Sequence, residues 1–591
     1  MALLLKRVAT QTPLTLLEAI CAQLPCVEVA RLACVHKAFL SAWLQLRARV
    51  PGARWQPPNA QTQALLTAFT PLERAACRGD KAVVALLLVD GADVHDEDDG
   101  ALRVAAEFGQ DAVVAQLLAA GGDVHASDDE ALKKAAEKGH SAVVARLLAA
   151  GANVNARELP ALVWASVYGH DEVVAQLLEA GADVHALNGY SLSCAARYGF
   201  ETIVDRLLVA GANVHARNDD ALHEAAKSGH VHSVARLLAA GADVRALDNH
   251  ALLEAASAGH DAVVAQLLAA GADVHAQRGI ALGLAAECGH DLVVARLLAA
   301  GADVHASDDV ALMLSAKSGH GVVVARLLQA GANVHGDSDA ALRTAAMYGH
   351  DSVIAQLLAA GANVHSSDGE ALHNAAFAGR DAVVARLLAA GADVHARDDI
   401  ALQKAAKYGH AAVVERLLAA GADVDAGYGG PLRAASQLED DAVVTQLLAA
   451  GADVHAQNDD ALRLAVRYGR GAVVARLIAA GANVRADSDA ALSLAVKHGH
   501  TAVVTQLLAA GADVHAHDDD ALQWAAKRGH DAIITQLLAA GADVHAKNDG
   551  ALSEAAEHNH ESAVALLLAA GAVRRDRSGA PIRVGRRRTR G

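Results

Sequence analysis

A glycine recurs every thirty residues along most of this 591-residue chain. The series begins at Gly79 and reaches position 559, and only Glu439 and Asn559 interrupt it among seventeen units. A second series runs from Gly91 to Gly571 without an exception. A fixed period of this length is the signature of a repeat array, in which each unit packs only against its neighbours. We therefore predict one solenoid instead of several globular domains.

Each unit is predicted to form two short helices. In the unit that starts at residue 131, Gly139 ends the first helix and Gly151 the second, because glycine readily adopts the left-handed backbone that closes a helix. The apolar stripes of these helices are Leu132, Ala135, Ala136, Val143, Val144, Leu147 and Leu148. Neither helix is long enough to be stable alone, so the units must stack, with an extended turn between them. Where Glu439 replaces the glycine, we expect strained left-handed backbone and a weakened unit.

Composition agrees with many small cores. Aromatic residues make up only 3% of the chain, and there are nine prolines. The net charge of −17 argues against nucleic acid or an anionic membrane as the partner, because both are polyanions. Six cysteines without a C-x-x-C pair are typical of a reducing compartment. No apolar stretch of about eighteen residues is free of charge, so we expect a soluble, cytoplasmic monomer.

Three motifs recur in the units: A-A-x-x-G-H, V-V-x-x-L-L and G-A-D-V-H-A. The first unit also carries Thr-Pro-Leu at residues 70–72, and a later unit keeps the proline as Pro431. These motifs resemble ankyrin repeats over roughly residues 61–571. The units are three residues shorter than that family's usual 33, and the missing residues fall where the family has its β-hairpin loop. The resemblance implies an all-α solenoid of about 17 helix-turn-helix units that binds protein partners. Compact units of this kind are similar to those of large DNA viruses and intracellular microbes.

Residues 13–50 lack the glycine period and form a different helical module. Residues 1–12 precede it, and the proline-containing residues 51–60 follow as a linker. The string Leu24-Pro25-x3-Val29-x2-Leu32-x2-Val35-x3-Phe39 resembles an F-box, a three-helix module that docks on the Skp-type adaptor of a cullin-based ubiquitin ligase. The resemblance implies adaptor contacts through Leu24, Pro25, Leu32 and Val35. The alternative is a helical cap that shields the open end of the first repeat.

Aromatic side chains gather at the residue just before the first glycine of a unit. The residues at this position include Phe108, Tyr168, Tyr198, Tyr348, Tyr408 and Tyr468. The resemblance implies that they face the concave groove, since the variable residues of A-A-x-x-G-H usually do so in the ankyrin family. Tyrosine suits a partner contact because it combines apolar area, a hydroxyl and little rotamer entropy. The alternative is a half-exposed helix end that merely tolerates aromatics.

Histidines and aspartate pairs also recur at fixed positions. A metal site needs three or four ligands that converge on one point, whereas these residues are spread along the array. The histidines are therefore predicted to hydrogen-bond turns and helix ends locally. The aspartate pairs, such as Asp128-Asp129 and Asp398-Asp399, are predicted to be solvated turn residues, with repulsion of anions or attraction of basic partners as the alternative. No nucleotide-binding or nucleophile motif occurs, so we predict no enzyme activity, cofactor or bound metal.

Two functions follow from this organisation. In the first, the chain is a substrate-recruiting subunit of a cullin-type ubiquitin ligase, and the repeats bind the target protein. In the second, the chain is a scaffold or inhibitor that occupies a partner without ubiquitin chemistry. Residues 572–591 form a basic tail, which is either disordered with no dedicated partner or a nuclear-import or polyanion-binding segment.

Overall fold

The computed structural model describes residues 70–573, apart from 157–159. Every regular element within those ranges is a helix, and no strand occurs there. The prediction of an all-α repeat region is therefore confirmed. The F-box-like module, with the predicted adaptor contacts of Leu24, Pro25, Leu32 and Val35, lies outside the described residues. The basic tail beyond residue 573 lies outside them as well.

Two kinds of helix alternate along the chain. The first helices of the repeats are α6 (Pro71–Arg78), α8 (Asp96–Glu107), α10 (Ala126–Lys138), α12 (Ala161–Tyr168), α14 (Ala186–Tyr198), α16 (Asp220–Ser228), α18 (Ala246–Ala258), α20 (Ala276–Glu287), α22 (Ala306–Ser318), α24 (Gly336–Tyr348), α26 (Ser366–Phe377), α28 (Ala396–Tyr408), α30 (Ala426–Ala435), α32 (Ala456–Arg467), α34 (Ala486–His498), α36 (Ala516–Arg528) and α38 (Ala546–Glu557). The second helices are α7 (Lys81–Val89), α9 (Asp111–Ala119), α11 (Ser141–Ala149), α13 (Asp171–Glu179), α15 (Glu201–Val209), α17 (Val231–Ala239), α19 (Asp261–Ala269), α21 (Asp291–Ala299), α23 (Gly321–Gln329), α25 (Asp351–Ala359), α27 (Asp381–Ala389), α29 (Ala411–Ala419), α31 (Ala442–Ala449), α33 (Gly471–Ala479), α35 (Thr501–Ala509), α37 (Asp531–Ala539) and α39 (Glu561–Ala569).

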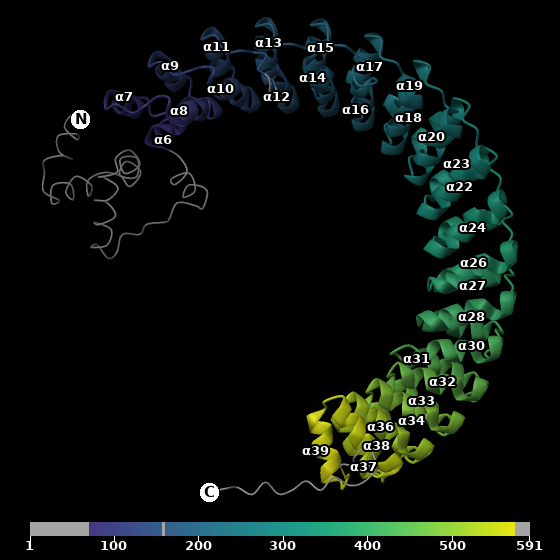
Figure 1. Ribbon diagram of the computed structural model, residues 1–591. Coiled ribbons are helices and arrows are strands. Elements are labelled where there is room, and N and C mark those ends of the chain that lie inside the picture. Colours follow the sequence, from purple (N-terminus) through teal and green to yellow (C-terminus); the bar gives the residue numbers. More distant parts are fainter. Residues whose placement is uncertain (1–69, 157–159, 574–591) are drawn as a thin grey trace, which may run out of the picture. The chain divides into compact units, whose positions relative to one another are not determined.

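These helices group into two compact units, whose boundary falls within α20. The first unit contains α6 to α19, and the second contains α22 to α39. Within each unit, a first helix packs against the first helix of the next repeat, and second helices pack against one another in the same way. Figure 1 shows this side-by-side packing for α22, α24, α26 and α28. Each unit therefore has a layer of first helices and a layer of second helices.

Small apolar side chains hold the two layers together. Ala135 and Ala136 are fully buried on the first helix, as are Val144 and Leu147 on the second. Alanine lets neighbouring first helices approach closely. This close packing increases the dispersion attraction between their side chains. The predicted stripe is confirmed except at Leu148, which is only partly buried.

The turn between repeats differs from the predicted extended segment. It contains three consecutive residues in the left-handed conformation, which in one repeat are Ser127, Asp128 and Asp129 with φ of 50°, 59° and 59°. The first helix of the repeat follows directly. This left-handed turn occupies the place where the longer units of the family carry their hairpin. Aspartate and asparagine tolerate the conformation better than most side chains, which accounts for their abundance here.

The second aspartate of each pair is buried, so the prediction of solvated aspartates is wrong for it. Asp129 is 3% exposed, and its carboxylate accepts a hydrogen bond from the backbone N–H of Asn153 in the next turn at 2.7 Å. His125 donates from Nδ1 to the same carboxylate at 3.1 Å. The third left-handed residue accepts the same backbone bond at Asp99, Asp219, Asn249, Asp309, Asp339, Asp399, Asp459, Asp489, Asp519 and Asp549. These carboxylates and the single amide tie their turns to the following ones, and we call them the aspartate ladder. Other turns have Gly189, Gly279, Gly369 or Gly429 at this position and lack the bond.

In most repeats a histidine follows the first glycine and ties the repeat to the preceding one. The ring of His140 lies against Gly109, and its Nε2–H donates to the carbonyl of Glu107 at 3.0 Å. A Cβ on Gly109 would come within 2.6 Å of the His140 ring, so the position needs glycine for space as well as for its left-handed φ of 71°. Histidines are thus hydrogen-bonded to turns and helix ends as predicted, although this contact joins two repeats.

The repeat that contains Glu439 avoids strain by shortening its first helix. Glu439 has no positive φ, in contrast to Asn559 with φ of 59°, so the expected left-handed glutamate is wrong. Instead α30 ends at Ala435, and the next repeat supplies contacts: the Arg470 guanidinium donates to the Gln437 carbonyl at 2.8 Å and pairs with Glu439 at 2.7 Å. We therefore expect the weakness of this repeat to come from missing helical hydrogen bonds.

We predict that residues 431–450 open earlier than the rest of the second unit. A shortened helix leaves fewer protected amides, and the stability of a repeat array is close to a sum over neighbouring repeats. Native-state hydrogen exchange measures this directly. The double variant Glu439→Gly, Asp440→His restores the usual glycine and histidine, and it should slow exchange in this segment. Uniform protection along the second unit would contradict the prediction.

Candidate functional site

The residues that differ between repeats lie together on the first helices. We define the first-helix face as the two residues between A-L and A-A in the motif A-L-x-x-A-A-x-x-G, together with the two residues before the glycine, which we call the pre-glycine pair. The buried alanines, valines and leucines hardly vary between repeats, whereas this face carries every class of side chain. For example, the third of its four positions holds Glu137, Arg197, Ser257, Met347, Phe377 and Lys407, none of which is buried. A constant scaffold therefore displays a variable surface.

The six predicted aromatic residues lie at the exposed end of their first helices. Their exposed fractions run from 43% for Phe108 to 50% for Tyr168 and Tyr198, so they are surface groups that are half covered. Four of them lie beside the ring two residues later; for example, Tyr348 stacks on His350 with the centroids 6.4 Å apart, and Tyr408 stacks on His410 in the same way.

These aromatics do not form one cluster. Phe108, Tyr168 and Tyr198 belong to the first unit, and Tyr348, Tyr408 and Tyr468 belong to the second. Tyr168 and Tyr198 occupy adjacent repeats, whereas the three tyrosines of the second unit alternate with other residues. Phe377 partly fills one gap, because its ring meets Tyr408 edge to face at 4.8 Å. The structure thus offers two aromatic groups on separate units.

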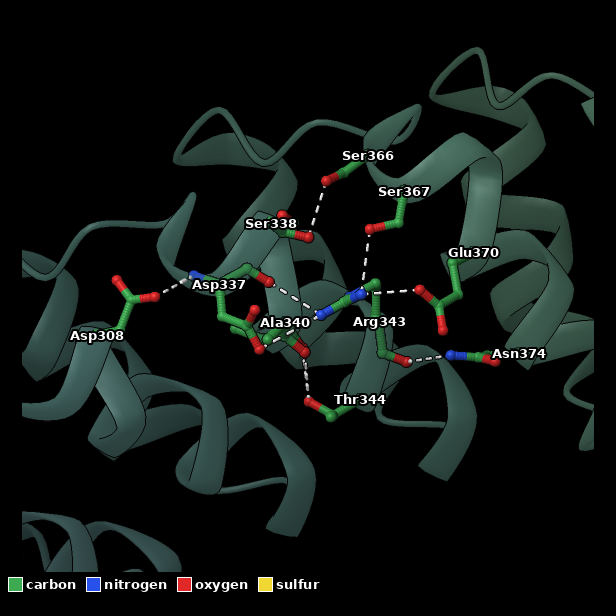
Figure 2. Close-up of polar contacts among 11 residues, drawn as sticks. Asp308, Asp337, Ser338, Ala340, Arg343, Thr344, Ser366, Ser367, Glu370 and Asn374 are labelled. Carbon is green, nitrogen blue, oxygen red and sulfur yellow. Dashed lines mark hydrogen bonds and ion pairs between the residues drawn. The ribbon is translucent and has the colours of Figure 1, made fainter.

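Arg343 is the centre of a polar network that sequence reasoning missed. Figure 2 shows its guanidinium between two repeats: it donates to Ser367 Oγ at 3.1 Å and to Glu370 at 2.8 Å, both on α26, and to the Asp337 carbonyl at 2.9 Å. Arg343 is 19% exposed on its side chain. Nothing in the thirty-residue period marks Arg343, because its partners come from variable positions of the next repeat. The only available signal was opposite charge at positions 27 residues apart.

The second helices carry a more regular electrostatic pattern. Arg146 of one repeat forms a two-pronged hydrogen bond with Asp111 of the preceding repeat at 2.5 and 2.7 Å. The hydrogen bond from Arg146 lowers the pKa of Asp111 below its ordinary value. Equivalent pairs join Arg206 to Asp171, Arg326 to Asp291, Arg386 to Asp351 and Arg416 to Asp381. Because these exposed pairs satisfy one another, this face has fewer groups to offer a partner.

Metal chemistry finds no support in the described part of the chain. No group of three or more histidine, cysteine, aspartate or glutamate side chains is placed there to hold a metal ion. The histidines instead engage the aspartate ladder or the backbone of the preceding repeat. None of the helices between residues 70 and 573 is long and apolar enough to cross a membrane.

Comparison with known families identifies the repeats. A model of three consecutive ankyrin repeats matches residues 102–188, 192–278, 282–368, 342–428, 372–458 and 431–518. A model of a single ankyrin repeat matches residues 69–99 and 517–549. A comparison with curated proteins found no match. The two models together account for well over half of the sequence, and their boundaries agree with the helix pairs of the structure. The chain is therefore a member of the ankyrin repeat family.

Proposed function

We propose that this chain selects a protein target through its first-helix face. Ankyrin repeats indicate a protein–protein interaction role, and such proteins are typically binding scaffolds without enzyme activity. The observation that carries the proposal is the contrast between a nearly constant scaffold and a variable, partly exposed face on one helix layer. Affinity at such surfaces comes from a few aromatic and arginine anchors surrounded by neutral contacts. The half-exposed tyrosines are the candidates for these anchors.

We propose further that residues 13–50 act as an F-box, so that the target becomes a substrate of a cullin-type ubiquitin ligase. The support for this step is the sequence string around Leu24 and Pro25 and its position ahead of a repeat domain. The second candidate is a scaffold or inhibitor in which residues 13–50 cap the first repeat. Both candidates use the same first-helix face.

The tyrosines provide the first test. Replacing Tyr168, Tyr198, Tyr348, Tyr408 and Tyr468 with alanine should weaken capture of the target by about tenfold or more, as expected when interface anchors are truncated. The thermal melt followed by circular dichroism should change little, because these side chains lie beside the buried stripe and do not belong to it. Intact binding with a collapsed melt would show that the tyrosines are packing residues.

The adaptor provides the second test, which separates the two candidates. The double variant Leu24→Ala, Pro25→Ala should abolish co-purification of the full chain with a Skp-type adaptor, and it should leave hydrogen exchange in α6 and α7 unchanged. The capping alternative predicts the reverse: the wild-type chain recovers no adaptor, and removal of residues 1–50 speeds exchange in α6 and α7. Failure of the wild-type chain to bind any Skp-type adaptor would leave the scaffold function.

A further inference from the structure

Cations at the pre-glycine pair fall into two groups. Lys138, Arg197, Lys227 and Lys317 each contact a carboxylate of their own or a neighbouring first helix, at 2.6 to 3.5 Å. The local charge of their surface is therefore largely cancelled. A different situation is found on α28, α32, α34 and α36, each of which presents a cation that no carboxylate neutralises. The intervening α30 repeat has Gln437 and Leu438 at the pre-glycine pair, and Lys527 on α36 pairs with Glu554 at 3.3 Å.

Four exposed cations of the second unit have no ion pair among the described residues: Lys407 on α28, Arg467 on α32, Lys497 on α34 and Arg528 on α36. We call them the basic strip. Neighbouring carboxylates are already taken, since Arg433 and Arg463 both hold Asp460, and Arg470 holds Glu439. Uncompensated charge on four of the five first helices from α28 to α36 is unexpected in a chain with a net charge of −17 unless an anionic partner supplies the missing counter-charge.

Three members of the basic strip act on one histidine. Burial is the largest cause of the lowered pKa of His498, and the positive charges around it on the three packed helices lower it further. These groups are Arg467 on α32, Lys497 on α34 itself and Arg528 on α36, with His500 beside them. The side chains are therefore close enough to act together on a ligand that crosses the helices.

Aromatic rings lie among these cations. Tyr408 and Tyr468 are 45% and 46% exposed and directly follow Lys407 and Arg467 in the chain. Trp524 is partly exposed, and the Lys497 ammonium lies 4.8 Å from the centre of its ring. Its indole N–H donates to Asp520 at 2.9 Å, which fixes the ring in place. Held rings of this kind add apolar contact at little entropic cost.

We propose that the first-helix face from α28 to α36 is a docking strip for an extended acidic segment of a protein partner. The proposal rests on the proposed function and names the chemistry of its partner. Neighbouring helices pack about 10 Å apart, and an extended chain advances about 3.3 Å per residue, so one repeat corresponds to about three partner residues. A segment of about twelve residues spans the strip, with carboxylates at every third position and apolar side chains between them. The carboxylates meet the basic strip, and the apolar side chains contact the rings.

The experiment measures binding of a labelled peptide to the full-length chain by fluorescence anisotropy. The probe is a peptide of about fifteen residues built from Glu-Leu-Ser units, which matches the three-residue spacing. Gln-Leu-Ser peptide and single-stranded DNA of similar length are run in parallel. The wild-type chain should bind the glutamate peptide, and binding should weaken between about 50 and 300 mM salt as exposed charges are screened.

Charge reversal locates the site. The strip variant carries Lys407→Glu, Arg467→Glu, Lys497→Glu and Arg528→Glu, and it should bind the glutamate peptide at least about tenfold more weakly. The matched control reverses four pre-glycine cations of the first unit through Arg78→Glu, Lys138→Glu, Arg197→Glu and Lys227→Glu, and it should bind like wild type. Both variants should retain the circular dichroism spectrum and melt of wild type, because all eight positions lie outside the buried core.

Three results would overturn the inference. The first is that the wild-type chain does not bind the glutamate peptide. The second is that both variants lose peptide binding equally. The third is that DNA binds as tightly as the peptide or more tightly, which would make the strip a nucleic-acid surface. Capture of the target protein by the strip variant and by the tyrosine variant distinguishes failure of this inference from failure of the proposed function. If the target stays bound to the strip variant but is lost from the tyrosine variant, only the acidic-segment inference fails. If neither variant affects capture, the proposed function fails as well.

Discussion

Alanine at Asp399 is expected to destabilise the junction between α28 and α30 by about 2–4 kcal/mol. The Asp399 carboxylate is 4% exposed and accepts from the backbone N–H of Asp423 at 2.9 Å and from His395 at 3.2 Å. Truncation leaves the backbone N–H of Asp423, which is part-buried in this bond, without its partner, and such a loss costs about 1–3 kcal/mol by itself. The lost bond to His395 adds the rest, and we measure the effect as faster amide exchange in α28 and α30.

Asp398 provides the matched control. It is the exposed neighbour of Asp399, and the two residues have similar left-handed φ values of 58° and 51°. Asp398→Ala therefore introduces the same backbone strain without removing a ladder bond. Asp399→Asn should be almost neutral, because Asn249 already accepts the equivalent bond from Asp273 at 2.7 Å. Equal effects of alanine at 398 and 399 would show that the aspartate ladder contributes nothing beyond backbone conformation.

Alanine at Gly379 is expected to destabilise the junction between α26 and α28 by about 2–3 kcal/mol. Gly379 has φ of 68°, and a left-handed alanine costs about 1–2 kcal/mol. Its Cβ would also lie 2.6 Å from the ring of His410, so the ring must move and its hydrogen bond to the Phe377 carbonyl, now 3.0 Å, is lost. That bond is worth about a further 1 kcal/mol. Local amide exchange across α26 to α29 measures the change.

A substitution at Gly391 separates the cost of left-handed backbone from the cost of displacing the His410 ring. Its φ of 90° is also left-handed, but no atom lies within 4 Å of a built Cβ. Gly391→Ala should therefore cost only the backbone term, about 1–2 kcal/mol. His410→Ala in the Gly379→Ala background completes a double-mutant cycle, and the combined loss should be smaller than the sum of the single losses. Additive losses would mean that the ring and the glycine do not interact.

The repeat pattern predicted the scaffold well because the scaffold repeats. Buried positions such as Ala135 and Val144 recur every thirty residues, so one unit explains all of them. The turn was predicted less well. The sequence predicts solvated aspartates because a polar pair between helices ordinarily faces water. It does not reveal that the backbone turns left-handed and directs Asp129 toward the next repeat.

The candidate site was only partly predictable for a related reason. The tyrosines were visible because they share one repeat position, and the structure places them on the surface. Arg343 and the basic strip were not visible as a site, because their character depends on which carboxylates lie beside them. Whether a cation is neutralised depends on the side chains of the neighbouring repeat. Lys227 and Lys497 look alike in the sequence, but only Lys227 contacts a glutamate.

The junctions between repeats have a direction. The aspartate ladder reaches forward by 24 residues, and the histidine reaches backward by 33, so a repeat that carries both residues offers an acceptor ahead and a ring behind. A cut at one turn and a join at another, a multiple of thirty residues away, recreates both contacts when the joined repeats carry these residues. Unequal recombination between such copies within a gene would therefore yield arrays of different length whose new junctions keep both contacts. The number of repeats can then change faster than the residues on the first-helix face. An array can therefore lengthen during evolution before its binding specificity changes.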